Sequence, residues 1–307
     1  MEPQRKIWKE YMENCKICPR NCGVNRMEGK LGFCQSTEKI KVARAALHFW
    51  EEPCISGKYG SGAVFFSGCS MGCVFCQNES ISHGGAGKEI SLEYLAEIFL
   101  RLQDEKKAQN INLVTPTHYV PQIVEALIYA KKNGLIIPVV YNSSAYEKAE
   151  TLKMMEGLID IYLPDFKYMD GTIAKKYSHA EDYDFWAKQA IAEMVRQVPD
   201  IKFDEAGMMK RGVIVRHLIL PGCRKDSKKI LYYLRQTYGD KIFISLMNQY
   251  TPVNKLQKYP ELRRKVTKRE YEWVIQYALE IGVENGFIQE GDTAKESFIP
   301  PFNGEGV

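Results

Sequence analysis

The cysteines of segment 67–78 have a spacing suited to a redox-active metal cluster. Cys69, Cys73 and Cys76 follow one another at gaps of three and two residues, with no fourth cysteine in the run. Iron–sulfur clusters are held by cysteine thiolates, and a [4Fe–4S] cube offers four irons. Three thiolates leave one iron open, and an open metal position is typical of catalytic sites. A zinc site or unligated thiols are the alternatives, but zinc sites usually show two Cys-x2-Cys-type pairs.

A second cysteine group lies nearer the N-terminus. Cys15, Cys18, Cys22 and Cys34 form it, and glycines such as Gly32 permit the sharp turns that would bring their thiols together. Four clustered thiols resemble a complete metal shell. Zinc there would be sealed and structural, whereas a second iron–sulfur cluster could relay electrons. The spacing alone does not choose between zinc and iron.

The triad, with Phe75 just before its last cysteine, resembles the signature of the radical S-adenosylmethionine superfamily. The resemblance implies that the amino and carboxylate groups of S-adenosylmethionine chelate the open iron. It further implies that the reduced cluster cleaves this cofactor to a 5′-deoxyadenosyl radical, which abstracts a hydrogen from the substrate. Phe75 would lie near the adenine, and Asn78 would also contact the cofactor. An electron donor of the flavodoxin or ferredoxin type would reduce the cluster.

A wider pattern extends this resemblance over most of the chain. Cys-x2-Cys-Pro-Arg-x-Cys, Gly-x2-Gly-x-Cys, Glu51-Glu52-Pro53, Cys-Gln-Asn and Gln249-Tyr250-Thr-Pro252 occur in order along the chain. They resemble a branch related to the pyruvate formate-lyase activating enzymes. The branch implies an activase that makes a glycyl radical on a partner enzyme. An enzyme acting on a small molecule or a peptide is the other option, and the sequence names neither the substrate nor a catalytic residue.

Bulk composition sets limits on the class of protein. The 307 residues are 45% apolar and 26% charged, with a net charge of +4, as in an ordinary globular protein. Acids and bases are mixed, so we expect no nucleic-acid partner. The start lacks a secretory apolar core, and no apolar run reaches membrane-spanning length, so we expect no membrane association. Nine cysteines without a signal indicate metal ligands in a reducing cytoplasm.

Strand-like and helix-like segments alternate from about residue 60 onward. This pattern predicts βαβ units, a parallel sheet and an α/β fold; the resemblance implies a partial (β/α)6 TIM-like barrel. We expect an N-terminal cysteine-rich metal-binding segment over 1–48 and the barrel over 49–307. The expected strands are 62–67, 111–115, 136–141, 158–163, 212–220 and 241–246, with a short final strand at 286–289; the expected helices are 92–102, 120–132, 147–155, 183–198, 227–238 and 267–281.

Polar residues after the second and third expected strands are candidates for cofactor binding. Many members of the superfamily have a Gly-Gly-Glu-like motif after the second strand, but this chain has Thr115 and Thr117 there. Their hydroxyl oxygens could accept from an ammonium group; a β-branched strand end before a turn is the alternative for each. Asn142 and Ser143 offer donors to a carboxylate or a ribose, or form an ordinary turn.

Charged residues follow the fourth strand and interrupt the fifth. Asp165 and Lys167 share one face at period two, and a charged pair in a barrel mouth favours a ligand contact. Arg216 lies within an apolar run and needs an anionic partner. We expect a cofactor carboxylate there, with a buried salt bridge to Asp165 as the alternative. Weaker candidates, mainly for packing, are His118, Tyr119, His217, Gln249 and Tyr250.

A non-catalytic protein is the competing class. Such a module would carry zinc in both cysteine groups or an iron–sulfur cluster used only for electron transfer. The weak net charge and the polar strand ends argue against a binding module. Cys54 and Cys223 stand alone, and we expect neither to be a ligand.

Overall fold

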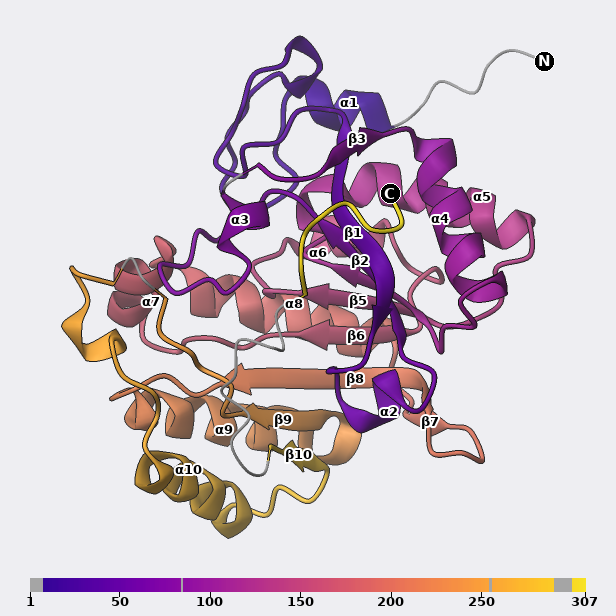
Figure 1. Ribbon diagram of the computed structural model, residues 1–307. Coiled ribbons are helices and arrows are strands. Elements are labelled where there is room, and N and C mark those ends of the chain that lie inside the picture. The colour runs from indigo at the N-terminus through magenta and orange to yellow at the C-terminus, as the bar shows by residue number, and fades with distance from the viewer. Residues whose placement is uncertain (1–7, 84, 254–255, 290–299) are drawn as a thin grey trace.

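Parallel strands form the centre of the fold in the computed structural model, which describes residues 8–83, 85–253, 256–289 and 300–307 (Figure 1). Across these residues, seven strands run parallel, and the arrows of β5, β6 and β8 point to the same side in Figure 1. The order of the parallel strands is β2 (Ser61–Phe66), β4 (Ile111–Val114), β5 (Val139–Ser143), β6 (Ile161–Pro164), β8 (Met209–Leu218), β9 (Phe243–Met247) and β10 (Gly286–Ile288). The ends of this order do not pair, so the predicted α/β partial barrel is confirmed.

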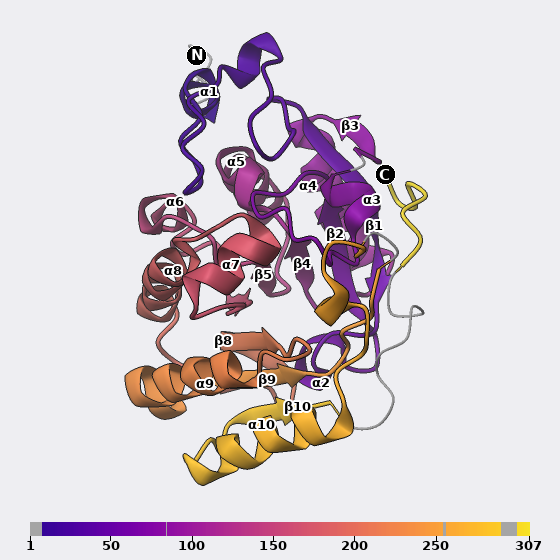
Figure 2. The same ribbon diagram turned by 90° about the vertical axis from the view of Figure 1, so that its left-hand side faces the viewer.

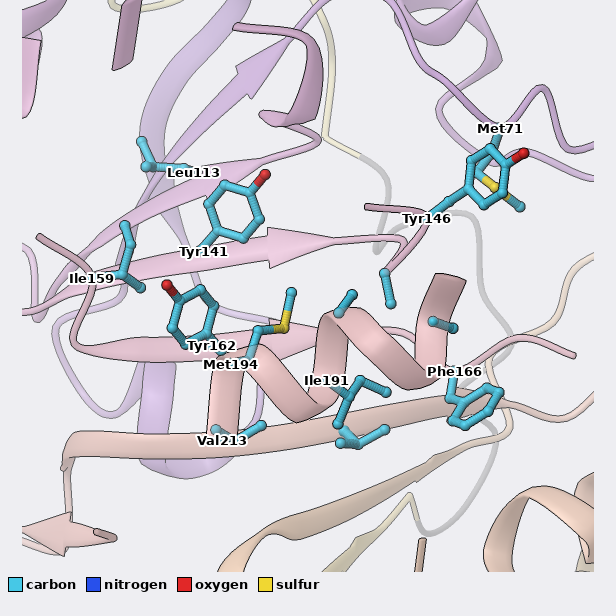
Figure 3. Packing of buried hydrophobic residues seen from close by; sticks show 14 of the residues in the cluster. Met71, Leu113, Tyr141, Tyr146, Ile159, Tyr162, Phe166, Ile191, Met194 and Val213 are labelled. Atoms are coloured by element: carbon cyan, nitrogen blue, oxygen red, sulfur yellow. The ribbon is translucent and has the colours of Figure 1, made fainter. Parts of the chain in front are cut away.

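Helices cover the outer face of the sheet (Figure 2). Side chains alternate between the faces of a strand, and Tyr141 and Tyr162 on the outer face pack near Met194 of a covering helix (Figure 3). Ser91 and Thr267 cap the helices that follow them, and Thr267 forms a capping box with Glu270. The helices that follow the strands are α4 (Leu92–Asp104), α5 (Val120–Lys132), α6 (Ala149–Lys153), α7 (Gly171–Ser178), α8 (Tyr183–Gln197), α9 (Arg224–Tyr238) and α10 (Lys268–Glu280).

The inner face of the sheet changes from apolar to polar along the strands. Near their N-terminal ends, Cys54 and Ile55 of the short helix α2 (Pro53–Ser56) pack against the sheet. Their contacts are inward-facing residues such as Val140, Leu163 and Ile214. Two residues later the same strands or strand ends present Asn142, Asp165 and Arg216. Cys54, Ile55 and the inward-facing residues that they contact form an apolar plug inside the barrel. A polar layer lies next to this plug, at the carboxyl ends of the strands.

Several elements were not predicted. Residues 40–48, which we assigned to the N-terminal segment, form β1 (Ile40–His48), antiparallel to β2 and to β3 (Lys88–Ile90). The strand expected from residue 136 begins at Val139, because Ile136 and Ile137 donate their backbone N–H groups to the Gln103 side chain (2.7 and 3.2 Å). The remaining short elements are α1 (Trp8–Glu13), α3 (Glu79–Ser82) and β7 (Lys202–Phe203). None of the described helices is long and apolar enough to cross a membrane.

Candidate active site

The cysteine triad lies on the loop between β2 and α3, at the carboxyl end of β2. The chain leaves the strand at Gly68, whose φ of +94° is a conformation that glycine adopts readily. The Gly68 N–H donates to the Ile81 carbonyl (2.9 Å), and the Val74 N–H donates to the Tyr177 carbonyl (2.9 Å). These bonds tie both arms of the loop to the neighbouring structure. A site at the carboxyl ends of parallel strands is the usual position in barrels.

Each sulfur of the triad accepts a hydrogen bond. The donors are the Met71 N–H to Cys69 (3.4 Å), the Ser178 hydroxyl to Cys73 (3.0 Å) and the Ser82 hydroxyl to Cys76 (3.4 Å). Burial, together with the other two thiols, raises the pKa of Cys69 to about 12. A bound metal would reverse this shift, because a coordinating thiol is deprotonated. The three sulfurs thus line the same cavity and are each supported by a hydrogen bond.

A cavity of about 550 Å³ opens beside the triad. Its volume falls in the range of small-molecule and cofactor sites. The triad shares it with most of the predicted cofactor residues, which are Phe75, Asn78, Thr115, Asn142, Ser143, Asp165, Lys167 and Arg216. Gln249 and Tyr250 also line it, and Tyr250 meets Phe75 edge-to-face at 5.9 Å between ring centroids. The structure therefore brings the strand-end candidates together around one space.

A network of charges crosses this cavity. Asp165 pairs with Lys167 (2.6 Å) and with Arg216 (3.0 Å). Burial alone would raise the pKa of Asp165, but the Lys167 and Arg216 charges hold it below its usual range. Arg216 also donates to Glu51 (3.1 Å) and to Asn142 (2.5 Å). Arg216 thus forms the buried salt bridge to Asp165 that we gave as the alternative to a cofactor carboxylate, and protein carboxylates balance its charge.

Glu51 and Glu52 are site residues that the sequence analysis missed. Both line the cavity, and burial raises the pKa of each carboxyl. Glu51 accepts from Asn112 (2.9 Å) and Arg216, whereas Oε2 of Glu52 is buried and, among the described residues, has no hydrogen-bond partner. The Glu-Glu-Pro motif was the available signal. We had used it only for family resemblance, because nothing in the local sequence shows that the chain before α2 reaches the centre of the barrel.

Thr117, His118 and Tyr119 lie away from the cavity lining. Thr117 is buried and donates its hydroxyl to the buried carboxyl of Glu147 (2.6 Å), outside the cavity. His118 is buried, with Nε2 at 2.7 Å from the Ser67 carbonyl. Thr115 does line the cavity, with a φ of +58° that turns the chain at the end of β4.

Three other residues are part of the packing. His217 is a core histidine whose ring nitrogens contact the Phe166 carbonyl and the Ser227 hydroxyl, each at 2.8 Å. Cys54 is buried with the plug, and Cys223 is packed against the main core. His217 is therefore a hydrogen-bonded core residue. Cys54 and Cys223 belong to neither of the two cysteine groups.

The triad offers the ligands of an iron–sulfur cluster. Its three sulfurs line one cavity, and each accepts a hydrogen bond. Thiolates hold [4Fe–4S] clusters, and three of them leave one of the four irons without a protein ligand. The residues present therefore fit a [4Fe–4S] cluster whose open iron would face the cavity.

Comparisons with known proteins agree with this geometry. The family model described as "Radical SAM superfamily" matches residues 63–208. An uncharacterized protein of Methanocaldococcus jannaschii is 31% identical over 282 residues, which cover 89% of this chain and 76% of that protein. This chain belongs to the radical SAM superfamily. A [4Fe–4S] cluster and S-adenosylmethionine are accordingly the cofactors of its family.

Two solved structures are similar to this radical SAM chain. SuiB of Streptococcus suis bound to S-adenosylmethionine superimposes with a TM-score of 0.50 at 13% identity, covering 73% of this chain and 49% of SuiB. A domain of the pyruvate-formate lyase-activating enzyme of Bacteroides vulgatus gives a TM-score of 0.41 at 14% identity, covering 56% of this chain and 92% of that domain. The radical SAM chain thus spans about half the length of SuiB, and its substrate is not fixed by these likenesses.

Proposed function

We propose that this protein abstracts hydrogen from a substrate held in the cavity beside the cysteine triad. The observation that carries the proposal is that the triad, the charge network and two buried glutamates line one space of about 550 Å³. When bound, the cluster and S-adenosylmethionine supply a 5′-deoxyadenosyl radical, which is chemistry that no side chain provides. The protein's part is to bind, to orient and to exclude water.

Particular residues would perform these tasks. Cys69, Cys73 and Cys76 would hold the cluster, and the Lys167 ammonium, whose charge acts on Cys73 and Cys76, would offset the negative charge of the thiolates. The rings of Phe75 and Tyr250 are buried and pack edge-to-face, so they offer an aromatic surface on which an adenine could pack. Asn142 and Ser143 at the end of β5, with Asn78 and Thr115, supply polar groups for the remaining parts of the cofactor.

Glu52 bears on the choice of substrate. Its Oε2 is buried beside the cavity without a described partner, and an unpartnered buried carboxylate oxygen carries a large desolvation cost. A hydrogen-bond donor on the substrate, such as an amine or amide, would remove that cost. Glu51 cannot take this role, because Arg216 and Asn112 already occupy it.

The motif resemblance bears on whether the substrate is a partner protein or a small molecule. The motifs shared with the activating-enzyme branch support an activase that makes a glycyl radical on a partner protein, and a backbone amide at Glu52 would suit such a substrate. A small molecule or peptide bearing an amine is the second candidate, favoured by the same carboxylate. In either case a one-electron donor of the flavodoxin or ferredoxin type would reduce the cluster.

The test is 5′-deoxyadenosine formation under strict anaerobiosis. Iron–sulfur-reconstituted protein is mixed with S-adenosylmethionine and dithionite, beside the Cys69→Ala/Cys73→Ala/Cys76→Ala variant. Product from the wild type alone supports the proposal. A reducible cluster that yields no product with any candidate substrate supports an electron-transfer role instead. A wild type that binds no iron overturns the proposal, and zinc in its place supports a non-catalytic metal-binding protein.

A further inference from the structure

Basic residues gather in three segments that follow strands of the barrel. Helix α7 carries Lys175 and Lys176 and no acidic residue. Segments 221–229 and 256–270, which include the starts of α9 and α10, together carry ten basic and three acidic residues. The rest of the chain carries 30 basic and 35 acidic residues. The mixing of charges that we expected from the composition therefore does not extend to these three segments, which we call the basic face.

Three contacts join these segments on one side of the molecule. Lys176 of α7 pairs with Glu261 (2.6 Å). The Gly222 N–H donates to the Glu270 carboxylate (2.9 Å). The Asp226 carboxylate accepts from the backbone N–H two residues before α7 (3.0 Å). The three segments therefore lie side by side at the carboxyl ends of the strands, with α7 near the middle of the view in Figure 2.

The acidic residues of the basic face offset few of its charges at the surface. Asp226 is buried, and Glu270 is used in the capping box of α10 and in a pair with Arg264 (2.7 Å). Lys225 and Arg263 are exposed and form no ion pair among the described residues. The basic face therefore presents positive charge to the solvent.

The basic face adjoins the loop of the cysteine triad. The Tyr177 carbonyl accepts from the N–H of Val74 in that loop (2.9 Å). The Ser178 hydroxyl donates to the Cys73 sulfur (3.0 Å). Lys176, whose side chain is half exposed, is thus two residues from a direct contact with a ligand of the cluster. A protein bound to this face would bring its own redox centre close to the triad.

We propose that an acidic one-electron donor protein docks on the basic face and reduces the cluster held by the triad. The donor gives up one electron, which takes the cluster from its oxidised to its reduced state, and no proton or atom moves. Opposite charges steer two such proteins together and fix their orientation. RNA is another polyanion that a basic surface binds, but it delivers no electron, so the contact between α7 and the triad loop favours the redox protein. The inference rests on the proposed radical reaction, which requires a reduced cluster.

Binding of a flavodoxin tests the docking site without catalysis. An acidic flavodoxin in its oxidised form is titrated into the iron–sulfur-reconstituted, full-length protein. Lys225→Glu/Arg263→Glu should weaken binding about tenfold, because attraction becomes repulsion at two exposed positions. The control, Lys106→Glu/Lys107→Glu, makes the same change in net charge at an exposed pair before β4, at the opposite ends of the strands. It should weaken binding less than about twofold, and raising the salt from about 50 to about 200 mM should weaken wild-type binding.

Electron delivery is the second measurement. Reduced flavodoxin should reduce the cluster of Lys225→Glu/Arg263→Glu about tenfold more slowly than that of the control. Dithionite, a small reductant that needs no docking surface, should reduce the two variants at equal rates. Equal flavodoxin binding or equal flavodoxin-driven reduction in the two variants would overturn the docking site, and so would transfer RNA that displaces flavodoxin from the wild type. Formation of 5′-deoxyadenosine with dithionite tests the radical reaction separately, so the two failures are distinguishable.

Discussion

The two cysteine groups face different surroundings. Cys69, Cys73 and Cys76 line a cavity, whereas three of the four N-terminal cysteines are buried and one, Cys22, lies at the surface. A metal held by the triad would have an open side toward the strand ends, and one held by the N-terminal group would be closed by thiolates. Open and closed shells are the usual mark of catalytic and structural centres. Similar short spacings in the sequence therefore lie in different surroundings, which the fold sets.

The buried arginines beside the two groups repeat this difference. Arg216 in the cavity is balanced by the carboxylates of Asp165 and Glu51, which the protein supplies itself. Arg26 has carbonyl oxygens and thiols as its partners. The radical site therefore has its charges set before any cofactor binds, and the N-terminal site would reach balance only with its metal.

Arg216→Gln should give the largest loss of stability. It leaves Asp165 and Glu51 buried without their shared cation, and removing one partner of a buried pair costs about 3–5 kcal/mol. Anaerobic urea unfolding measures the change. Arg211→Gln on the same strand removes only a bond to the Gln197 carbonyl and should cost about 1 kcal/mol. An equal loss of stability in both variants would contradict the balance of charges proposed for Arg216. A loss at Arg216 that disappears when metal is removed would show that this balance depends on the metal.

Gly68→Ala should have the next largest effect, because the two cysteine regions touch at this residue. An added Cβ would lie 2.6 Å from the Cys34 carbonyl oxygen, and the φ of +94° is itself unfavourable for alanine. Steric overlap and strain together predict a loss of about 3 kcal/mol. Gly29→Ala has a similar positive φ of +74° but no neighbour within 4 Å, so about 1 kcal/mol is expected from the same urea titration. Equal losses would show that the contact is not tight.

This contact also shows where sequence reasoning stops. The alternating pattern was enough to predict the parallel strands, whereas the partial barrel came from the family resemblance. The triad together with Asp165, Lys167 and Arg216 was predicted from spacing and strand ends. Glu52 and Arg20 were missed, because their partners are distant in sequence: Arg20 meets Ser70 and Ser178, while Glu52 reaches the cavity through the chain before α2. Thr117 was proposed because its strand end is correct, but the turn after Thr115 directs its hydroxyl to Glu147.

The buried carboxyl of Glu147, in the region that contacts the N-terminal cysteine segment, should make the stability of the fold depend on pH. Its neighbours Tyr146 and Lys148 contact Arg20 and Asn21, and burial raises the pKa of Glu147 to about 7. The folded state therefore holds a proton that the unfolded state has released above pH 4.5, so stability falls as the pH rises toward 7. The expected loss is about 2 kcal/mol between pH 5.5 and 8.

Glu147→Gln isolates this contribution. The amide does not titrate but can still accept from Thr117 and Tyr141, which contact Oε1 of the glutamate at 2.6 and 3.1 Å. The difference in unfolding free energy between wild type and variant should thus change with pH by the amount given above and level off above pH 7. A constant difference across the range would show that Glu147 is ionised in the folded protein at all these pH values.

Ser178→Ala should produce the smallest effect, and one confined to the triad. The hydroxyl donates to the Cys73 sulfur at 3.0 Å, and hydrogen bonds to cluster ligands favour the reduced, more negative state. Losing about 1 kcal/mol of this preference lowers the potential of a one-electron couple by about 40 mV. Ser82→Ala, whose bond to Cys76 is longer at 3.4 Å, should shift it less. A redox titration followed by electron paramagnetic resonance measures both. An equal shift in both variants would show that the length of the bond to the sulfur does not set the size of the effect.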